Sequence, residues 1–161
     1  RIQKLIVAMK ETLARTPDGV GLAAPQIGES LRMFIISDEA EEIDRAEERS
    51  PQAHDQNNTN ELAYEKRPWH YYVFINPVVK RMSKRKLKAP EGCLSVPGLF
   101  GSVDRLEKVT VEAYDEHGKK ITRGGSRFFA RVMQHELDHL DGALFIDKAE
   151  RLVRNARAVE Q

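Results

Sequence analysis

The segment Gln134-His135-Glu136-Leu137-Asp138-His139 holds two histidines four residues apart, with a glutamate between them. On an α-helix, residues i and i+4 lie on the same face, so His135 and His139 can bind one metal ion. Glu136 then projects beside that ion, where it can accept a proton from water. This H-E-x-x-H pattern predicts a helix that supports metal-assisted hydrolysis of a carbonyl compound.

The residues around the motif predict that this helix is buried. Apolar residues occur on more than one side of it, namely Phe128, Phe129, Val132, Met133, Leu137 and Leu140. Buried histidines and a buried glutamate need partners, and a metal supplies them. Ser126 is a candidate N-cap and Gly142 a candidate stop signal, so we expect the helix to span about residues 127–141.

A catalytic metal site usually has three protein ligands and one open position, so a third ligand is needed. The chain has a single cysteine, Cys93, in the segment Glu91-Gly92-Cys93-Leu94-Ser95-Val96-Pro97-Gly98. A lone cysteine is most often a small buried apolar residue, but the surrounding glycine and Pro-Gly turn favour a shaped loop and a ligand. One cysteine also excludes an internal disulfide and a four-cysteine zinc site. A thiolate with two imidazoles suits iron(II), cobalt, nickel or zinc, and residue chemistry alone does not choose among them.

A third segment, Gly19-Val20-Gly21-Leu22-Ala23-Ala24-Pro25-Gln26-Ile27-Gly28, is rich in glycine. Its glycines allow close backbone approach, but it lacks the G-K-[ST] ending of a phosphate loop. A tight turn between a helix and a strand is the alternative interpretation. Gln26 offers a neutral amide that can stabilise a developing oxyanion.

Together, the three segments resemble the peptide deformylase family. Its signatures, G-x-G-L-A-A-x-Q, E-G-C-L-S and Q-H-E-x-D-H-L, match Gly19 to Gln26, Glu91 to Ser95 and Gln134 to Leu140 in the same order. The resemblance covers most of the chain except residues 38–70. It implies a metal-dependent hydrolase that removes the formyl group from the N-terminal formyl-methionine of newly made polypeptides and releases formate.

The resemblance also implies roles for individual residues. Cys93, His135 and His139 correspond to the metal ligands, and Glu136 corresponds to the general acid and base. Gln26 and the backbone N–H of Leu94 correspond to the oxyanion hole. Contacts with the substrate are implied for the backbone of Gly21, for Arg105 near the downstream peptide, and for a methionine pocket lined by Val20, Val96, Phe128, Val132 and His135.

The implied cofactor is one divalent metal ion, with iron(II) as the expected native metal and nickel(II), cobalt(II) or zinc(II) as alternatives. The implied partners are N-formylmethionyl peptides and nascent chains. Lys148, Arg151, Arg154 and Arg157 are spaced like one face of a final helix from about Lys148, which is either solvated or a contact with the ribosome. The Leu22-Ala23-Ala24 form of the first motif favours a bacterial-type cytoplasmic enzyme, with an organelle as the alternative.

Length and composition fit one globular domain over residues 1–161. Of its 161 residues, 40% are hydrophobic and 32% charged, and the net charge of +1 gives no strong field toward membranes or sequence-specific nucleic acid. No apolar run is long enough to cross a membrane and no secretory signal is evident. Because family members normally carry a further stretch before the position of Arg1, we expect the natural protein to extend beyond it.

The periodicity predicts an α+β fold, with antiparallel or mixed sheets packed around a central buried helix that carries H-E-x-x-H. We expect a helix over residues 2–15 and strands over 31–37, 71–79, 103–114 and 119–123. The acidic and polar residues 38–70 are interpreted as a solvated insertion or mobile loop, with a lid or interaction surface as the alternative.

Two other functions remain open at this point. A zinc metalloprotease of the H-E-x-x-H type would need a downstream ligand, but no histidine follows His139, and the only later glutamates are Glu150 and Glu160. A non-catalytic, metal-stabilised ribosome-interaction module would need a closed site with four ligands.

Overall fold

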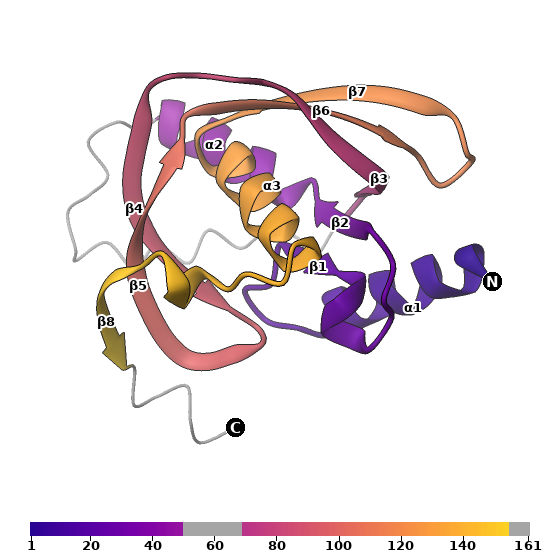
Figure 1. Cartoon of the computed structure of the whole chain (residues 1–161), viewed down its shortest axis with the longest axis horizontal. Helices are drawn as coiled ribbons and strands as arrows, with labels where there is room; N and C mark the ends of the chain where they lie inside the picture. The colour runs from indigo at the N-terminus through magenta and orange to yellow at the C-terminus, as the bar shows by residue number, and fades with distance from the viewer. Residues whose placement is uncertain (50–68, 155–161) are drawn as a thin grey trace.

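Helix α3 (Arg127–Leu140) runs through the middle of the fold, between two antiparallel β-sheets (Figure 1). The computed structural model describes residues 1–49 and 69–154. Besides α3, these residues form the helices α1 (Ile2–Ala14) and α2 (Glu39–Arg49) and the short 3-10 helices η1 (Ala24–Ile27) and η2 (Phe145–Asp147). The expected α+β class with antiparallel sheets is confirmed, and the H-E-x-x-H residues lie within α3.

The larger sheet has five strands in the order β1-β2-β3-β6-β7, and the smaller one has the order β4-β5-β8. All pairings between neighbouring strands are antiparallel. The strands are β1 (Gly21–Ala23), β2 (Met33–Ser37), β3 (Tyr71–Met82), β4 (Lys86–Cys93), β5 (Val96–Leu106), β6 (Lys108–Tyr114), β7 (Lys120–Ser126) and β8 (Glu150–Arg154).

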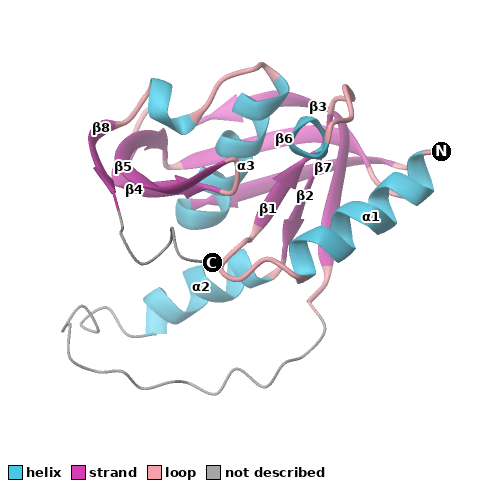
Figure 2. Ribbon diagram, turned by 90° about the horizontal axis from the view of Figure 1, so that it is seen from below, coloured by secondary structure: helices cyan, strands magenta, loops and turns pink. Residues whose placement is uncertain are grey.

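Strand β2 is buried on both faces because each face of the larger sheet is covered by a helix. Side chains alternate along a strand, so Phe34 and Ile36 point to one side and Met33 and Ile35 to the other. The first pair packs in the core around α3, and the second pair packs against α1. Figure 2 shows α1 lying along the larger sheet, away from α3.

The expected strand over residues 103–114 is divided in the structure. Residues up to Leu106 belong to β5 in the smaller sheet, and residues from Lys108 belong to β6 in the larger one. Glu107 lies at the crossing, and its N–H donates to the carbonyl of Arg85. Alternate residues are buried along both strands, Val103 and Arg105 on β5 and Val109, Val111 and Ala113 on β6. One alternation of buried and exposed positions therefore spans two sheets.

Glu39–Arg49 forms helix α2, where we expected a solvated or mobile segment. Glutamate, alanine and arginine are good helix formers, and Arg45 pairs with both Glu41 and Glu42 along the helix. The remaining part of the proposed insertion, from residue 50 to residue 68, lies outside the described residues.

The expected helix from about Lys148 is wrong over residues 150–154. These residues form β8, which pairs with β5 through Phe100↔Val153 and Ser102↔Glu150. The basic spacing suggested a helix, but the free edge of β5 offered backbone partners. Arg151 has a positive φ of 52°, which a continuous helix does not allow.

None of the helices that the structure describes has the length and apolar character needed to span a bilayer.

Candidate metal centre

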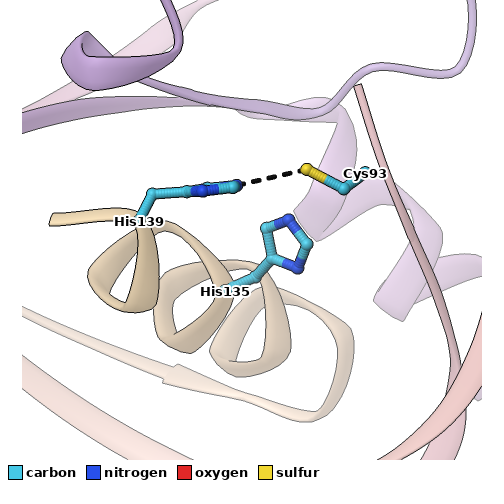
Figure 3. A group of neighbouring side chains, drawn as sticks. All are labelled: Cys93, His135 and His139. Carbon is cyan, nitrogen blue, oxygen red and sulfur yellow. Dashed lines mark hydrogen bonds between the residues drawn. The ribbon is translucent and has the colours of Figure 1, made fainter. Parts of the chain in front are cut away.

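Three potential metal ligands converge on one side of α3 (Figure 3). One ligand atom from each of Cys93, His135 and His139 lies within 4.8 Å of the others. The Sγ of Cys93 is 3.2 Å from Nε2 of His139, and the two imidazole rings stand edge to face with centroids 4.9 Å apart. The predicted ligands therefore meet, although Cys93 lies 46 residues before His139.

Cys93 reaches the helix from the turn of the β4–β5 hairpin. The regular pairing of the hairpin shifts between Gly92 and Cys93, after which Cys93 pairs with Val96 across the turn. The N–H of Ser95 points back at the sulfur from 3.4 Å. A glycine suits position 92, because a Cβ on Gly92 would lie 2.7 Å from the ring of Phe100 and would force that ring to move. The predicted shaped loop is thus a tight hairpin end.

The electrostatics of the three side chains favour a thiolate. Burial raises the pKa of the Cys93 thiol, but hydrogen bonds with His135 and His139 outweigh that effect and lower it to about 5. Burial lowers the pKa of His135, but its bonds to Cys93 and Glu91 outweigh this and raise it to about 10. A thiolate beside two imidazoles can bind a metal cation, and the proton held by His135 would be released when the metal binds.

Glu91 orients the His135 ring from the side opposite to the sulfur. Its Oε2 lies 2.9 Å from Nδ1 of His135, so Nε2 is the ring nitrogen left for a metal. The same carboxylate receives two hydrogen bonds from Arg105 and one from Arg131. Burial raises the pKa of Glu91, but the bonds from Arg105 and His135 reverse the shift and lower it to about 2. Glu91 therefore stays ionised.

Glu136 is the buried acid of the site. Its side chain is 3% exposed, and Oε2 has no hydrogen-bond partner within the described part of the chain. Burial raises the pKa of the Glu136 carboxyl to about 7. Oε1 lies so close to β1 that a Cβ on Gly21 would come within 2.4 Å of it. A carboxylate with an unpartnered oxygen is positioned to bind water or substrate.

The donor set fits one divalent metal ion. One thiolate and two imidazoles are ligands for zinc, iron(II), cobalt and nickel, and three protein ligands leave a position open. Cys93, His135 and Glu136 also line a cavity of about 420 Å³ that opens to the surface. Cys93 and His135 thus face a space large enough for a side chain and part of a peptide.

The sequence as a whole matches a known family model. The model described as "Polypeptide deformylase" matches residues 1–155. The chain belongs to this family.

Curated relatives come from plants and from bacteria. Peptide deformylase 1A, chloroplastic/mitochondrial, from Arabidopsis thaliana is 43% identical over 148 residues, which cover 92% of this chain and 51% of the relative. A peptide deformylase from Desulforudis audaxviator is 39% identical, over 92% of this chain and 78% of the relative. The chain spans about half the length of the two plant relatives, 51% and 50%.

Solved structures of the family have the same fold. Peptide deformylase from Thermotoga maritima superposes with a TM-score of 0.69 at 31% identity, over 93% of this chain and 82% of that one. A Synechococcus elongatus peptide deformylase in complex with actinonin gives a TM-score of 0.69 at 31% identity, over 93% of this chain and 66% of that one.

Most of the residues implied by the family signatures line the same cavity. These are Val20, Gly21, Gln26, Cys93, Leu94, Phe128, Val132, His135 and Glu136. Val96, expected in the methionine pocket, is not part of the cavity lining. On this part of β5 the cavity is lined instead by Pro97, Gly98 and Phe100, which follow Val96 in the sequence.

Arg105 does not reach the cavity, although we expected it near the downstream peptide. It is 4% exposed and lies behind the ligands, where Nε and Nη2 bind Glu91 and Nη1 binds Asp138 at 2.6 Å. An arginine with both ends paired and buried supports the site rather than contacting a peptide. The expected substrate contact of Arg105 is therefore wrong for this structure.

Sequence reasoning missed the roles of Glu91 and Arg131. Arg131 is buried on α3 one turn before His135, where it bonds Glu91 and the carbonyls of Val103 and Leu87. Its signal in the sequence was a charge inside an otherwise apolar helix face, since such a charge needs a buried partner. The partner could not be named without the register of β4 and β5.

Proposed function

We propose that this protein removes the formyl group from peptides that begin with formyl-methionine and releases formate. The observation that carries the proposal is the buried carboxylate of Glu136 next to the group of Cys93, His135 and His139. Glu136 lines one cavity together with Cys93 and His135. Membership of the polypeptide deformylase family supports the same chemistry.

Cys93, His135 and His139 would hold the metal, and we propose iron(II) as the native ion, with nickel, cobalt or zinc able to replace it. When bound, such an ion supplies Lewis-acid activation of water and of the formyl carbonyl. Two of these ligands are themselves held by hydrogen bonds. Glu91 binds Nδ1 of His135, and the N–H of Ser95 donates to the sulfur of Cys93.

Glu136 moves the proton in this proposal. Its Oε2 accepts a proton from the attacking water, and the carboxyl then gives it to the departing amine nitrogen of methionine. Burial raises the pKa of this carboxyl to about 7, which suits a group that must both take and return a proton near neutral pH. The reaction cleaves the C–N bond of the formamide and leaves a free amino terminus.

Gln26 is oriented to stabilise the developing oxyanion. Its Oε1 accepts the N–H of Ala23 at 2.8 Å, so the amide nitrogen must point the other way, toward Ser95 Oγ at 3.0 Å and Cys93 Sγ at 3.7 Å. The second proposed donor is the backbone N–H of Leu94, which follows the ligand cysteine. Loss of one such donor typically costs about 3–4 kcal/mol of barrier.

The cavity supports a preference for an apolar first side chain. Val20, Phe128 and Val132 form an apolar wall near the ligands, and Gly21 lies at the cavity on β1, an edge strand of the larger sheet. We propose that the methionine side chain packs against this wall while the peptide backbone runs along Gly21. We also propose that a tight fit beside the buried Glu136 carboxylate admits the formyl hydrogen and excludes larger acyl groups.

The alternatives have less support. The protease would need Glu150 or Glu160 as a ligand, but Glu150 lies on β8 and pairs with Lys88 at 2.7 Å, and Glu160 lies outside the described residues. The structural module would need a fourth ligand, and three are found among the described residues. A ribosome contact stays a prediction. The helix expected to carry it is replaced by strand β8 over residues 150–154. The compartment also stays a prediction, since the relatives include bacterial and organellar proteins.

One experiment tests the proposal directly. Protein loaded with iron(II), nickel or cobalt is incubated with formyl-Met-Ala-Ser, and formate and new primary amine are measured, with acetyl-Met-Ala-Ser as the control. We expect equal amounts of formate and amine from the formyl peptide only. Cleavage of casein without formate release would instead support a protease. An activity that decays in air with iron and persists with nickel would support iron(II) as the native metal.

A further inference from the structure

Helix α3 has no N-cap of its own. Strand β7 passes directly into the helix, and the side chain of Ser126 at the N-cap position makes no capping hydrogen bond. The first helical residue, Arg127, has a positive φ of 50°. A non-glycine residue in this region is strained and persists only when its surroundings hold it.

Asp44 of α2 supplies the missing cap from a distant part of the chain. Its Oδ1 accepts the N–H of Phe128 and its Oδ2 accepts the N–H of Phe129, each at 3.0 Å. The guanidinium of Arg127 donates to the backbone carbonyl of Asp44 at 2.8 Å. A carboxylate that receives two N–H groups at a helix N-terminus satisfies otherwise unpaired donors and opposes the positive end of the helix dipole.

A second carboxylate of α2 supports the same region. Glu41 accepts a hydrogen bond from the hydroxyl of Tyr72 at 2.7 Å and also pairs with Arg123. The guanidinium of Arg123 lies over the ring of Tyr72 at 4.5 Å and over the ring of Phe129 at 5.3 Å. Only Ala40 of α2 is fully buried, so the helix docks largely through its acidic side chains.

The capped residues lead into the cavity wall. Phe128, whose N–H binds Asp44, lines the cavity, and Val132 follows one turn later on the same face. Glu136 lies two turns beyond Phe128, and His135 is held separately by Glu91. Asp44 therefore acts on the apolar end of the cavity rather than on the metal ligands.

We propose that Asp44 is a positioning residue for substrate selectivity. By holding the first turn of α3, it fixes the Phe128 ring against which a long apolar first side chain packs. This inference rests on the proposed function and extends it, because it assigns α2 to recognition of the residue that carries the formyl group.

The test compares Asp44→Ala with Glu48→Ala in the metal-loaded protein. Glu48 lies on the same helix and carries the same charge, but its side chain is 64% exposed and it pairs with Arg127 at 3.4 Å. Its removal leaves the hydrogen bonds from the Phe128 and Phe129 N–H groups to Asp44 intact. The substrates are formyl-Met-Ala-Ser, which would use Phe128, and formyl-Ala-Ala-Ser, which would not reach it.

For Asp44→Ala, KM for the formyl-Met peptide should rise by up to about thirtyfold, the limit that applies if substrate binding must restore the whole helix turn that the N-cap stabilised. KM for the formyl-Ala peptide, kcat for both peptides and metal content should stay within about twofold of the wild type. Asp44→Asn keeps one acceptor oxygen, so its KM for the formyl-Met peptide should lie between those of the wild type and Asp44→Ala. Glu48→Ala should match the wild type.

An equal loss of kcat/KM for both peptides in Asp44→Ala, or an unchanged KM for the formyl-Met peptide, would overturn the inference. A readout independent of activity separates it from the proposed function. Asp44→Ala and Asp44→Asn should speed hydrogen exchange at the amides of Phe128 and Phe129, and unchanged exchange there would also overturn it. If the wild type hydrolyses no formyl peptide, the proposed function fails first, and the exchange data still decide whether Asp44 holds the helix start.

Discussion

Nδ1 of His135 lies 2.9 Å from Oε2 of Glu91, on the side of the ring away from Cys93. The bond fixes both the ring orientation and the nitrogen that can bind a metal. Because Glu91 also neutralises Arg105 and Arg131, one carboxylate links the ligand geometry to the buried charges that join α3 to the smaller sheet.

Glu91→Gln should weaken both metal binding and folding. Loss of a partner that orients a ligand histidine typically lowers metal affinity by about 10–100-fold. Loss of the charge leaves two buried arginines short of a partner, so the free energy of unfolding should fall by roughly 3 kcal/mol or more. Chelator competition and denaturant unfolding measure the two effects.

Glu150→Gln is the control for that change, since Glu150 is an exposed carboxylate whose pair with Lys88 is worth little. We expect it to alter stability by no more than about 0.5 kcal/mol. Wild-type metal affinity in Glu91→Gln would contradict the role given to Glu91.

Gly21→Ala should damage activity more than stability. The added Cβ would lie 2.4 Å from Oε1 of Glu136 and 2.9 Å from Cγ1 of Val132, so the Glu136 carboxylate must move. A displacement of about 1 Å at a reacting group can cost on the order of 100-fold in rate. Gly124→Ala is the matched control, because its Cβ meets nothing closer than Thr110 Oγ1 at 3.6 Å. Equal kcat/KM losses in both variants would argue against the steric explanation.

Glu136→Gln should keep the metal and lose turnover. Removal of a general acid and base typically lowers kcat by about 10²–10⁴-fold. Stability should not fall, because the variant replaces a buried ionisable group that has an unpartnered oxygen with a neutral amide. Steady-state kinetics, metal analysis and thermal unfolding check the three statements. Substantial residual kcat would remove Glu136 from the proton transfer.

Cys93→Ser should abolish the thiolate charge-transfer absorption of the cobalt-loaded protein and weaken metal binding. The chain has one cysteine, so any such band in the wild type reports on this residue alone. In the wild type, a band that shifts when an inhibitor is added would indicate an open coordination position. A band that persists in Cys93→Ser would exclude Cys93 as a ligand.

Local sequence pattern was sufficient for α3 and for α1. Both helices repeat apolar residues at helical spacing, and their bounds, Arg127–Leu140 and Ile2–Ala14, agree with the expected ranges to within one or two residues. The pairing of His135 with His139 follows from the helix itself. The approach of Cys93 does not, because it depends on how the β4–β5 hairpin lies against α3. The glycine and Pro-Gly turn around Cys93 favoured a ligand, and the family resemblance indicated the same role.

Two segments were misread because tertiary partners outweighed local composition. The acidic residues of α2 look solvated in the sequence, yet Asp44 finds the N–H groups of α3 and Glu41 finds Tyr72 and Arg123. The residues of β8 have the charge spacing of a helix, yet they complete the edge of β5. In each case the deciding partner was distant in the chain and carried no local signal.

The ligands in the H-E-x-x-H helix and the sulfur of the β4–β5 hairpin meet only when the two sheets have closed around α3. Opening of the smaller sheet away from α3 would separate the sulfur from the two imidazoles. Metal binding and tertiary packing are therefore coupled, and we expect removal of a bound metal to loosen this interface.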